Sequence, residues 1–508
     1  MKSLDLIIIF GYLIGIVLFG TWFGRKQKTT ADYFLGDRSV PWWAVAFSIV
    51  ATETSTITFI SIPGVAFARG GNFAFLQLVF GYLLGRIVIS ILFIPSYFRG
   101  ELLTVYQLLD RRFGTQIKMV AASLFVVMRN IADGIRLLLT AIVLAAVYAA
   151  FQPSANAETI IILSIILIGL AMIIFTYFGG MEAVIWVEVV QLGIYIAGAI
   201  AAAVVLINSI DGGLAAAGSV ARQYSKYSLF DFSLDHTKTF TFWSGLIGGC
   251  FLTMSTHGTD QYLVQRYLCT DRPRKATVAL LTSGAIVLAQ FIGFLFIGVL
   301  LFAFYHPFTD PGYATVANTA FPFTGGDRVF PDFITKYMPT GLSGLVVAAI
   351  FAAAMSSSLN SIAATAVNDL YKPFRPNRDD KHYLKVSHVL TLTWGVVQIG
   401  VALAVRNQPG SALSMALSIA SLINGPILGV FLVGTFLRRV SQPPALIGML
   451  VSIVSMLYVF FATKIAWTWY VFLGSLITFV VAWLASFAFS RAAKAIPLGA
   501  VGPITDEE

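Results

Sequence analysis

The chain has 508 residues, of which 58% are apolar and only 11% are charged, and its mean hydropathy is +0.83. Soluble domains carry about 25% charged residues, so this composition excludes a protein that shows its whole surface to water. The net charge of +9 then reflects membrane topology rather than nucleic-acid binding, because cytoplasmic loops of membrane proteins are rich in Lys and Arg.

Apolar runs long enough to cross a bilayer recur along the chain, and the first is Leu4 to Gly24. Arg25, Lys26 and Lys28 follow it directly, which predicts a retained anchor with an extracytoplasmic N-terminus rather than a removable signal peptide. Thirteen spans are predicted, so the C-terminus is expected in the cytoplasm. The predicted spans are 3–24, 42–68, 72–98, 118–150, 157–178, 183–209, 241–262, 276–305, 341–366, 385–405, 411–437, 442–463 and 466–490. This topology puts more than twice as many lysines and arginines in cytoplasmic segments as in outer ones.

The spans group into an all-α integral membrane fold with two halves of five helices each. Because five is odd, the two halves would have opposite orientations in the membrane, as in transporters with inverted repeats. The predicted divisions are an anchor helix and loop (1–41), a first half (42–209), an outer loop (210–240), a second half (241–438) and two last helices with a tail (439–508).

The segment from Ala51 to Thr58, followed by Pro63 and Gly64, carries a run of hydroxyls around Glu53 in the middle of a predicted span. Unwound backbone here would free carbonyl oxygens, which are ligands that Na⁺ prefers. Alternatively, the hydroxyls bond back to their own helix and Pro63 only kinks it. The clustering of hydroxyls with a carboxylate favours a functional site.

Two further polar segments lie at membrane depth. Ala352 to Ser358, followed by Asn360 and Ser361, combines small residues with hydroxyls, and this pattern fits either close helix packing or a cation site. Thr253 to Gln261 opens the proposed second half. Its His257 is more often a packing histidine than a ligand, and its Asp260 and Gln261 are expected to stabilise the inner end of the helix.

Several charges fall inside predicted spans. Asp133 lies four residues after Arg129 and three before Arg136, a spacing that lets it pair with both. Arg86 has no obvious partner in sequence. Glu188 either attracts a cation near its exit path or pairs with a lysine or arginine at an interface.

Neither a Walker A signature nor a dinucleotide-binding fingerprint in a strand–turn–helix context occurs. No nucleophile–base or metal-ligand spacing indicates an enzyme, and the two cysteines, Cys250 and Cys269, form no disulfide framework. Transport driven by an ion gradient, without nucleotide or nucleic acid, is the expected activity.

A set of short motifs runs in one order along the chain. They are Ala51-Thr52-Glu53-Thr54-Ser55-Thr56, Tyr97-Phe98-Arg99, Arg112-Phe113-Gly114, Tyr177 to Trp186, Gly258 to Arg266, Gly341 to Leu345, and Ala353 to Ser357 with Asp369-Leu370-Tyr371. With these motifs the sequence strongly resembles the sodium:solute symporter family, as a bacterial-type member. The resemblance implies an inner-membrane symporter with the inverted five-helix fold of the bacterial leucine transporter, alternating access and Na⁺ as coupling ion.

The resemblance also implies a sodium site between the second and ninth spans. Carried over by position, Ala51, Thr54 and Ala353 would supply carbonyls, and Ser356 and Ser357 hydroxyls. The chain is about three residues shorter than many relatives between Met355 and Asn360, and an alignment anchored at Asn360 puts Ala353 and Ala354 at the hydroxyl positions. Relatives usually have Thr-Asp where this chain has Val187-Glu188.

The solute is less defined by the sequence. Val79, Val287 and Leu417 stand where the sugar-carrying branch has Glu, Lys and Gln, which disfavours a hexose. The stretch after Arg266 is more like the iodide, monocarboxylate and multivitamin branch. Expected solutes are a monocarboxylate, a vitamin, a sugar or an amino acid.

Span geometry gives five candidate solute-binding residues: Thr58, Gln77, Thr253, Thr256 and His257. The expected function is sodium-coupled symport of a small organic solute. The alternative is a proton-coupled carrier of the same fold, in which Glu53, Glu188 or His257 takes up the proton.

Overall fold

The structure is a computed structural model, and every regular element in its described residues is a helix. The described residues are 3–23, 29–54, 56–100, 102–152, 156–305, 326, 329–355, 358–406 and 412–489.

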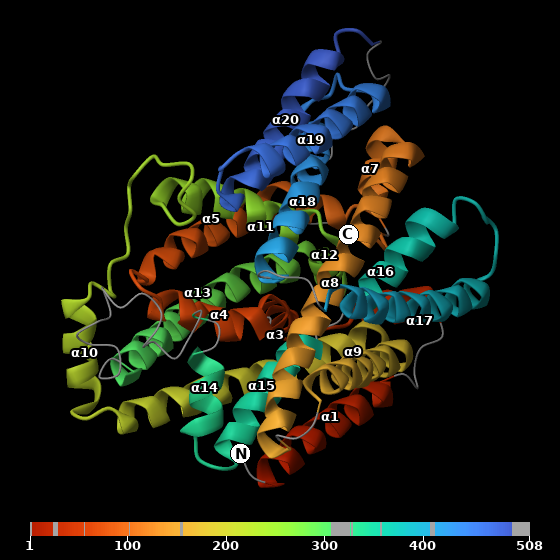
Figure 1. The fold of residues 1–508 in the computed structure, drawn as a ribbon. Helices are drawn as coiled ribbons and strands as arrows, with labels where there is room; N and C mark the ends of the chain where they lie inside the picture. Colours follow the sequence, from red (N-terminus) through yellow and green to blue (C-terminus); the bar gives the residue numbers. More distant parts are fainter. Residues whose placement is uncertain are drawn as a thin grey trace.

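Helices follow one another from the N-terminus into the outer loop (Figure 1). They are α1 (Ser3–Phe23), α2 (Thr30–Leu35), α3 (Trp42–Glu53), α4 (Thr56–Phe67), α5 (Leu76–Leu92), α6 (Ile94–Tyr97), α7 (Gln107–Phe113), α8 (Thr115–Phe151), α9 (Ala157–Ser209) and α10 (Gly213–Gln223). The remaining elements are η4 (Ser244–Gly248), α11 (Gly249–Gly258), α12 (Gln261–Leu268), α13 (Pro273–Tyr305), α14 (Val329–Lys336), α15 (Leu342–Met355), α16 (Leu359–Thr365), η7 (Ala366–Tyr371), α17 (Asp380–Val405), α18 (Ala412–Phe436), α19 (Gln442–Ala462) and α20 (Tyr470–Ala485).

Seven helices in the described residues are long and apolar enough to cross a membrane, and α3 with α4 makes an eighth span if the bent pair counts as one. Three shorter apolar helices lie at Glu158–Ile174, Leu342–Phe351 and Ala420–Phe436. An all-helical membrane protein is thereby confirmed, whereas the count of thirteen spans stays a prediction.

The predicted span over 42–68 is broken in the structure. α3 and α4 meet at an angle of more than 40°, and Thr54, the residue after α3, leaves the helical region with ψ at 74°. The break lies nine residues before Pro63, which sits inside α4. The proline is therefore not what interrupts the helix.

Two other predicted spans are also interrupted. The span 241–262 divides between α11 and α12, where Asp260 accepts a hydrogen bond from the backbone N–H of Tyr262 at 2.9 Å and caps α12. The span 341–366 divides between α15 and α16. By contrast, the predicted spans 157–178 and 183–209 join into α9, which bends at Gly180 because that residue takes a positive φ of 61°.

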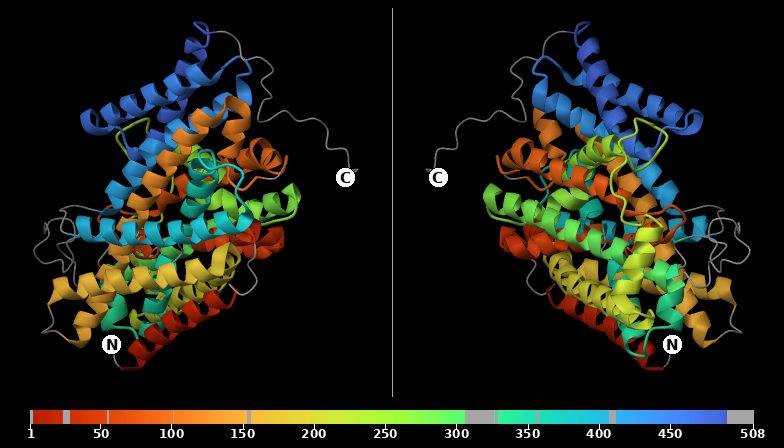
Figure 2. Two further views of the ribbon diagram at one scale, coloured as in Figure 1. Left: turned by 90° about the vertical axis from the view of Figure 1, so that its right-hand side faces the viewer. Right: turned by 90° about the vertical axis from the view of Figure 1, so that its left-hand side faces the viewer.

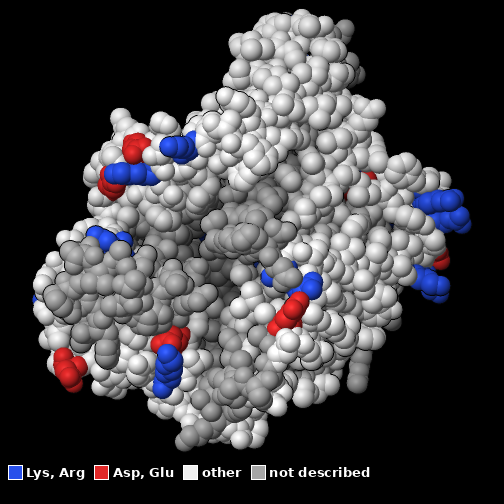
Figure 3. Space-filling view, in the orientation of Figure 1, with Lys and Arg blue, Asp and Glu red and all other residues white. Residues whose placement is uncertain are grey.

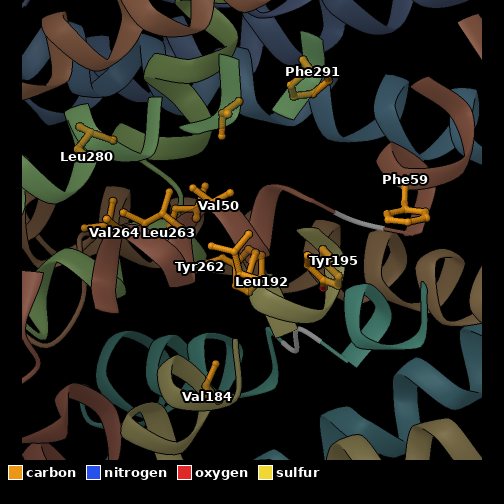
Figure 4. Close-up of a cluster of buried hydrophobic side chains, with 14 of the residues drawn as sticks. Val50, Phe59, Val184, Leu192, Tyr195, Tyr262, Leu263, Val264, Leu280 and Phe291 are labelled. Carbon is orange, nitrogen blue, oxygen red and sulfur yellow. The ribbon is translucent and has the colours of Figure 1, made fainter. Parts of the chain in front are cut away.

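The interrupted helices lie in the middle of the molecule. α1 and the pair α19 and α20 lie at opposite ends (Figures 1 and 2), while one buried apolar cluster unites Val50 of α3, Phe59 of α4, Tyr195 of α9 and Tyr262 of α12 (Figure 4). α5 packs on α11 and η4, and α13 packs on α3 and α4. The α3–α4 and α11–α12 breaks are thus packed against other helices.

The outer surface is largely uncharged. Figure 3 shows the charged side chains of one face gathered in a few small groups, with no Lys, Arg, Asp or Glu over most of the area that the structure describes. Large apolar side chains such as Ile7, Leu18 and Val454 are mostly exposed. Such a surface is suited to lipid rather than water.

Candidate functional site

The break between α3 and α4 places backbone and hydroxyl oxygens inside the molecule. The N–H and the hydroxyl of Thr54 both donate to the carbonyl of Val50, at 2.9 and 2.7 Å. α3 ends at Glu53, so Ala51 and Thr54 lie where the regular helical hydrogen-bonding pattern stops. Ala51 and Thr54 are both buried, and Gln290 of α13 donates to the Thr54 hydroxyl at 2.6 Å.

The other predicted sodium ligands lie at the end of α15. Ala353 belongs to the last turn of that helix, and Ser356 and Ser357 fall outside the described residues. α15 packs against α4, so the two interrupted helices are neighbours. Carbonyl and hydroxyl oxygens are a ligand set suited to a hard cation, but the assignment of these five ligands stays a prediction.

Three ionisable side chains meet beside the first break. Arg86 of α5 places Nη2 2.6 and 2.5 Å from the two carboxylate oxygens of Glu53, and His257 of α11 places Nε2 2.7 Å from Oε1 of the same carboxylate. The sequence alone missed the partner of Arg86. Glu53 and His257 lie 33 and 171 positions away, beyond any local spacing.

Four of the five solute-binding candidates lie in or beside this group, and His257 is itself one of its members. The hydroxyl of Thr58 donates to the carbonyl of Glu53 at 3.2 Å, and the hydroxyl of Thr256 lies 3.0 Å from Nδ1 of His257. Thr253 is buried on α11, beside Gly85 of α5. These positions line the region where α3, α4, α5 and α11 meet.

Gln77 is placed differently. It lies at the start of α5, where its Oε1 accepts from the N–H of Asp231 at 3.0 Å and its Nε2 faces the carbonyl of Phe240 at 3.4 Å. It therefore binds the loop predicted to be extracytoplasmic, and its amide is separated from the Thr58–Thr256 group. A role for Gln77 in solute binding stays a prediction.

Glu188 has an arginine partner. Arg266 of α12 places Nη2 2.5 Å from Oε1 and Nε 3.2 Å from Oε2, and the hydroxyls of Ser48 and Thr52 on α3 also bond the carboxylate. The pair joins α3, α9 and α12 and is completely buried. Glu188 is thus paired with an arginine, whereas its position at an interface and its role in a sodium exit path stay predictions.

The predicted pairing of Asp133 with two arginines is only half correct. Asp133 lies 3.8 Å from Arg136 and accepts from Ser358, but Arg129 forms its ion pair with Asp260 at the α11–α12 break. A long-range ion pair, between Arg129 of α8 and the residue that caps α12, replaces the pairing expected from local spacing. Asp260 thus serves the expected role of stabilising this helix end.

Interrupted membrane helices whose breaks gather buried hydroxyls and paired charges define the class of secondary transporters. The model of the sodium:solute symporter family matches residues 33–452, and the chain belongs to this family. Its members use Na⁺, which is therefore the coupling ion here.

Individual relatives agree with this assignment. The chain is 32% identical over 494 residues to the sodium/sialic acid symporter NanT of Aliivibrio fischeri, covering 96% of this chain and 94% of that protein. It is 29% identical to the sodium/sialic acid symporter SiaT of Proteus mirabilis, covering 92% of each. A solved structure of a substrate-bound, outward-open Na⁺-coupled sialic acid symporter matches with a TM-score of 0.83 and 28% identity, over 97% of this chain and 99% of that one.

Weaker similarity extends to sodium-dependent multivitamin, sodium-coupled monocarboxylate and sodium/iodide transporters, so the likeness to that branch is confirmed. All these relatives are transporters, which supports a function other than catalysis and a multi-pass membrane location. The proton-coupled alternative is not favoured. The orientation of the termini stays a prediction.

Proposed function

We propose that this chain carries a small organic acid together with Na⁺ across the inner membrane by alternating access. The observation that carries the proposal is the buried helix break at Thr54, where backbone and hydroxyl oxygens gather, in a member of a sodium symporter family. Relatives named for sialic acid, monocarboxylates and iodide all handle anions, and sialic acid is the first solute to test.

Contacts between helices support an inverted repeat of 42–209 and 241–438. α5, in the first half, packs on the broken helix of the second half, and α13, in the second half, packs on the broken helix of the first. α8 packs on α18, and the corresponding pair, α9 and α15, also packs. Such reciprocal pairing is expected when two halves are related by a pseudo-twofold axis in the membrane plane.

In this proposal the cation lies between the α3–α4 and α15–α16 breaks, held by Ala51, Thr54, Ala353, Ser356 and Ser357. The solute lies on the other side of Glu53, near Thr58, Thr253, Thr256 and His257. Both sites share the break, so occupancy of one alters the backbone that forms the other. That sharing is the physical basis for coupling, since a ligand shifts a conformational equilibrium only through contacts that differ between the two states.

Uptake into proteoliposomes tests the proposal, with a sodium gradient and a pH gradient imposed separately. Sialic acid, lactate, pantothenate, glucose and proline serve as the probe solutes. We expect accumulation of an acid only with an inward sodium gradient, and none with a pH gradient alone. Uptake that proceeds equally without sodium would refute the coupling, and sodium-driven uptake of glucose or proline alone would refute the solute class.

The sodium ligands are tested by Ser357→Ala. Loss of a ligand hydroxyl is expected to raise the sodium concentration for half-maximal uptake about tenfold, a loss typical of a hydrogen-bonding or ligand oxygen at a charged group. Solute affinity at saturating sodium should change far less. Ser361→Ala, in the buried and adjacent helix α16, is the matched control, and equal sodium dependence in the two variants would contradict the assignment of Ser357.

A further inference from the structure

The charge cluster of Glu53, Arg86 and His257 is the most concentrated group of ionisable side chains beside the proposed sodium site. Arg86 and His257 are almost completely buried, and the side chain of Glu53 is 17% exposed. One guanidinium nitrogen of Arg86 bridges both carboxylate oxygens. Nothing in the proposed solute or sodium ligand set accounts for this arginine.

The packing around Arg86 fixes where its charge lies. Its side chain crosses α13 at Gly284, where an added Cβ would come within 2.8 Å of Cδ of Arg86. Glycine at position 284 therefore leaves the space that the Arg86 side chain occupies. Nη1 of Arg86 faces the carbonyl of Tyr82 one turn earlier at 3.4 Å, so the guanidinium is held from two sides and directed at Glu53.

Glu53 connects the cluster to both proposed sites. It precedes Thr54, the expected sodium ligand, and its own carbonyl accepts from Thr58. Its carboxylate accepts from His257, whose other ring nitrogen faces Thr256. Because Glu53 directly precedes Thr54, any net charge on its carboxylate would act on the proposed cation site.

We propose that Arg86 sets the sodium affinity of this transporter by neutralising Glu53 beside the α3–α4 break. This inference rests on the proposed sodium site at Thr54. Arg86 is a positioning residue that acts through Glu53, and it contacts neither the cation nor the solute. Sodium release into the cytoplasm requires an affinity that is not too high, and a bare buried carboxylate next to the site would retain the cation.

The physical consequence has opposite signs for the two partners. Glu53→Gln leaves the positive charge of Arg86 uncompensated and repels the cation, whereas Arg86→Gln leaves the negative charge of Glu53 and attracts it. A unit charge within about 10 Å at an effective permittivity of about 20 changes cation affinity by about tenfold. A cluster that only braces the helices would weaken binding in both variants.

Binding of radioactive sodium to the purified protein, measured by scintillation proximity, tests the proposal without solute transport. The dissociation constant for sodium should rise about tenfold in Glu53→Gln and fall about tenfold in Arg86→Gln. It should stay within about threefold of the wild type in Arg86→Lys and in the double variant that combines Glu53→Gln with Arg86→Gln. Arg406→Gln is the control, because it removes an arginine from an exposed pair with Glu158 and should leave binding unchanged.

Shifts of Glu53→Gln and Arg86→Gln in the same direction, or of neither, would overturn the proposal. If Arg86→Gln does not yield folded protein, Glu53→Gln is compared with the double variant, because the two differ only in the charge at position 86, and the double variant should bind about tenfold more tightly. Equal binding there would also overturn it. Absence of sodium binding by the wild type would instead refute the proposed function itself.

Discussion

Substitution of Glu188 by Gln tests how strongly the paired charges hold the interrupted helices together. Gln has nearly the same shape and can still bond the hydroxyls of Ser48 and Thr52. It leaves Arg266, whose side chain has no exposed surface, without a countercharge. Breaking a buried ion pair by removing one partner costs about 3–5 kcal/mol.

The double variant Glu188→Gln with Arg266→Gln separates the charge effect from loss of packing. Removing both charges leaves no uncompensated ion, and replacing a whole buried pair is often nearly neutral. We therefore expect each single variant to lose about 3–5 kcal/mol of unfolding free energy, and the double variant to lose less than either one.

Thermal unfolding in detergent, followed by intrinsic tryptophan fluorescence, gives the order of stabilities. Glu158→Gln is the matched control, because its partner Arg406 lies 3.2 Å away and the two side chains are 59% and 30% exposed. Such an exposed pair contributes about 0–1 kcal/mol. If Glu188→Gln melts no lower than Glu158→Gln, or if the double variant is the least stable of all, the reasoning is refuted.

Two further predictions concern helix ends. Oδ1 of the buried Asp5 accepts from the N–H groups of Gly341 and Gly344 and from the Ser343 hydroxyl, at 2.7–2.9 Å. Asp5→Ala should lower the free energy of unfolding by about 1–2 kcal/mol, and Asp5→Asn should lower it less, as measured by thermal unfolding. Lys226 bonds three carbonyls at the end of α4, and burial lowers its pKa to about 7. The unfolded chain then binds more protons than the folded one between about pH 7 and pH 10, so stability should rise with pH over this window, and Lys226→Met should flatten the rise. A pH profile identical in Lys226→Met and wild type would contradict this.

Hydropathy alone located most of the helices, because apolar length is a local property of the chain. The bend of α9 at Gly180 lies in the short gap between the predicted spans 157–178 and 183–209. The ends of other helices were less accurate. Spans 241–262 and 341–366 were expected to continue where the structure interrupts them, since a break stabilised by a distant side chain leaves no mark in a hydropathy window.

The partners of the buried arginines could not be predicted from the sequence. Local spacing assigned Arg129 to Asp133, four residues away, and left Arg86 unpaired. Both arginines pair with residues on other helices. The segment around Glu53 and the segment Thr253 to Gln261 did mark places where polar side chains gather, because their composition is unusual within a single span.

The α3–α4 and α11–α12 breaks share a physical requirement that explains why these pairs exist. A helix that ends at membrane depth exposes backbone polar groups and side-chain carboxylates to a medium of low permittivity, where an unpaired charge is costly. Glu53 ends α3 and Asp260 caps α12, and each carboxylate is neutralised by an arginine, Arg86 from α5 or Arg129 from α8. Both arginines belong to the proposed first half, so the second half depends on the first to stabilise its own break. The α11–α12 break therefore requires the two proposed halves to be packed together, whereas the pair at the α3–α4 break, Glu53 with Arg86, lies within the first half alone.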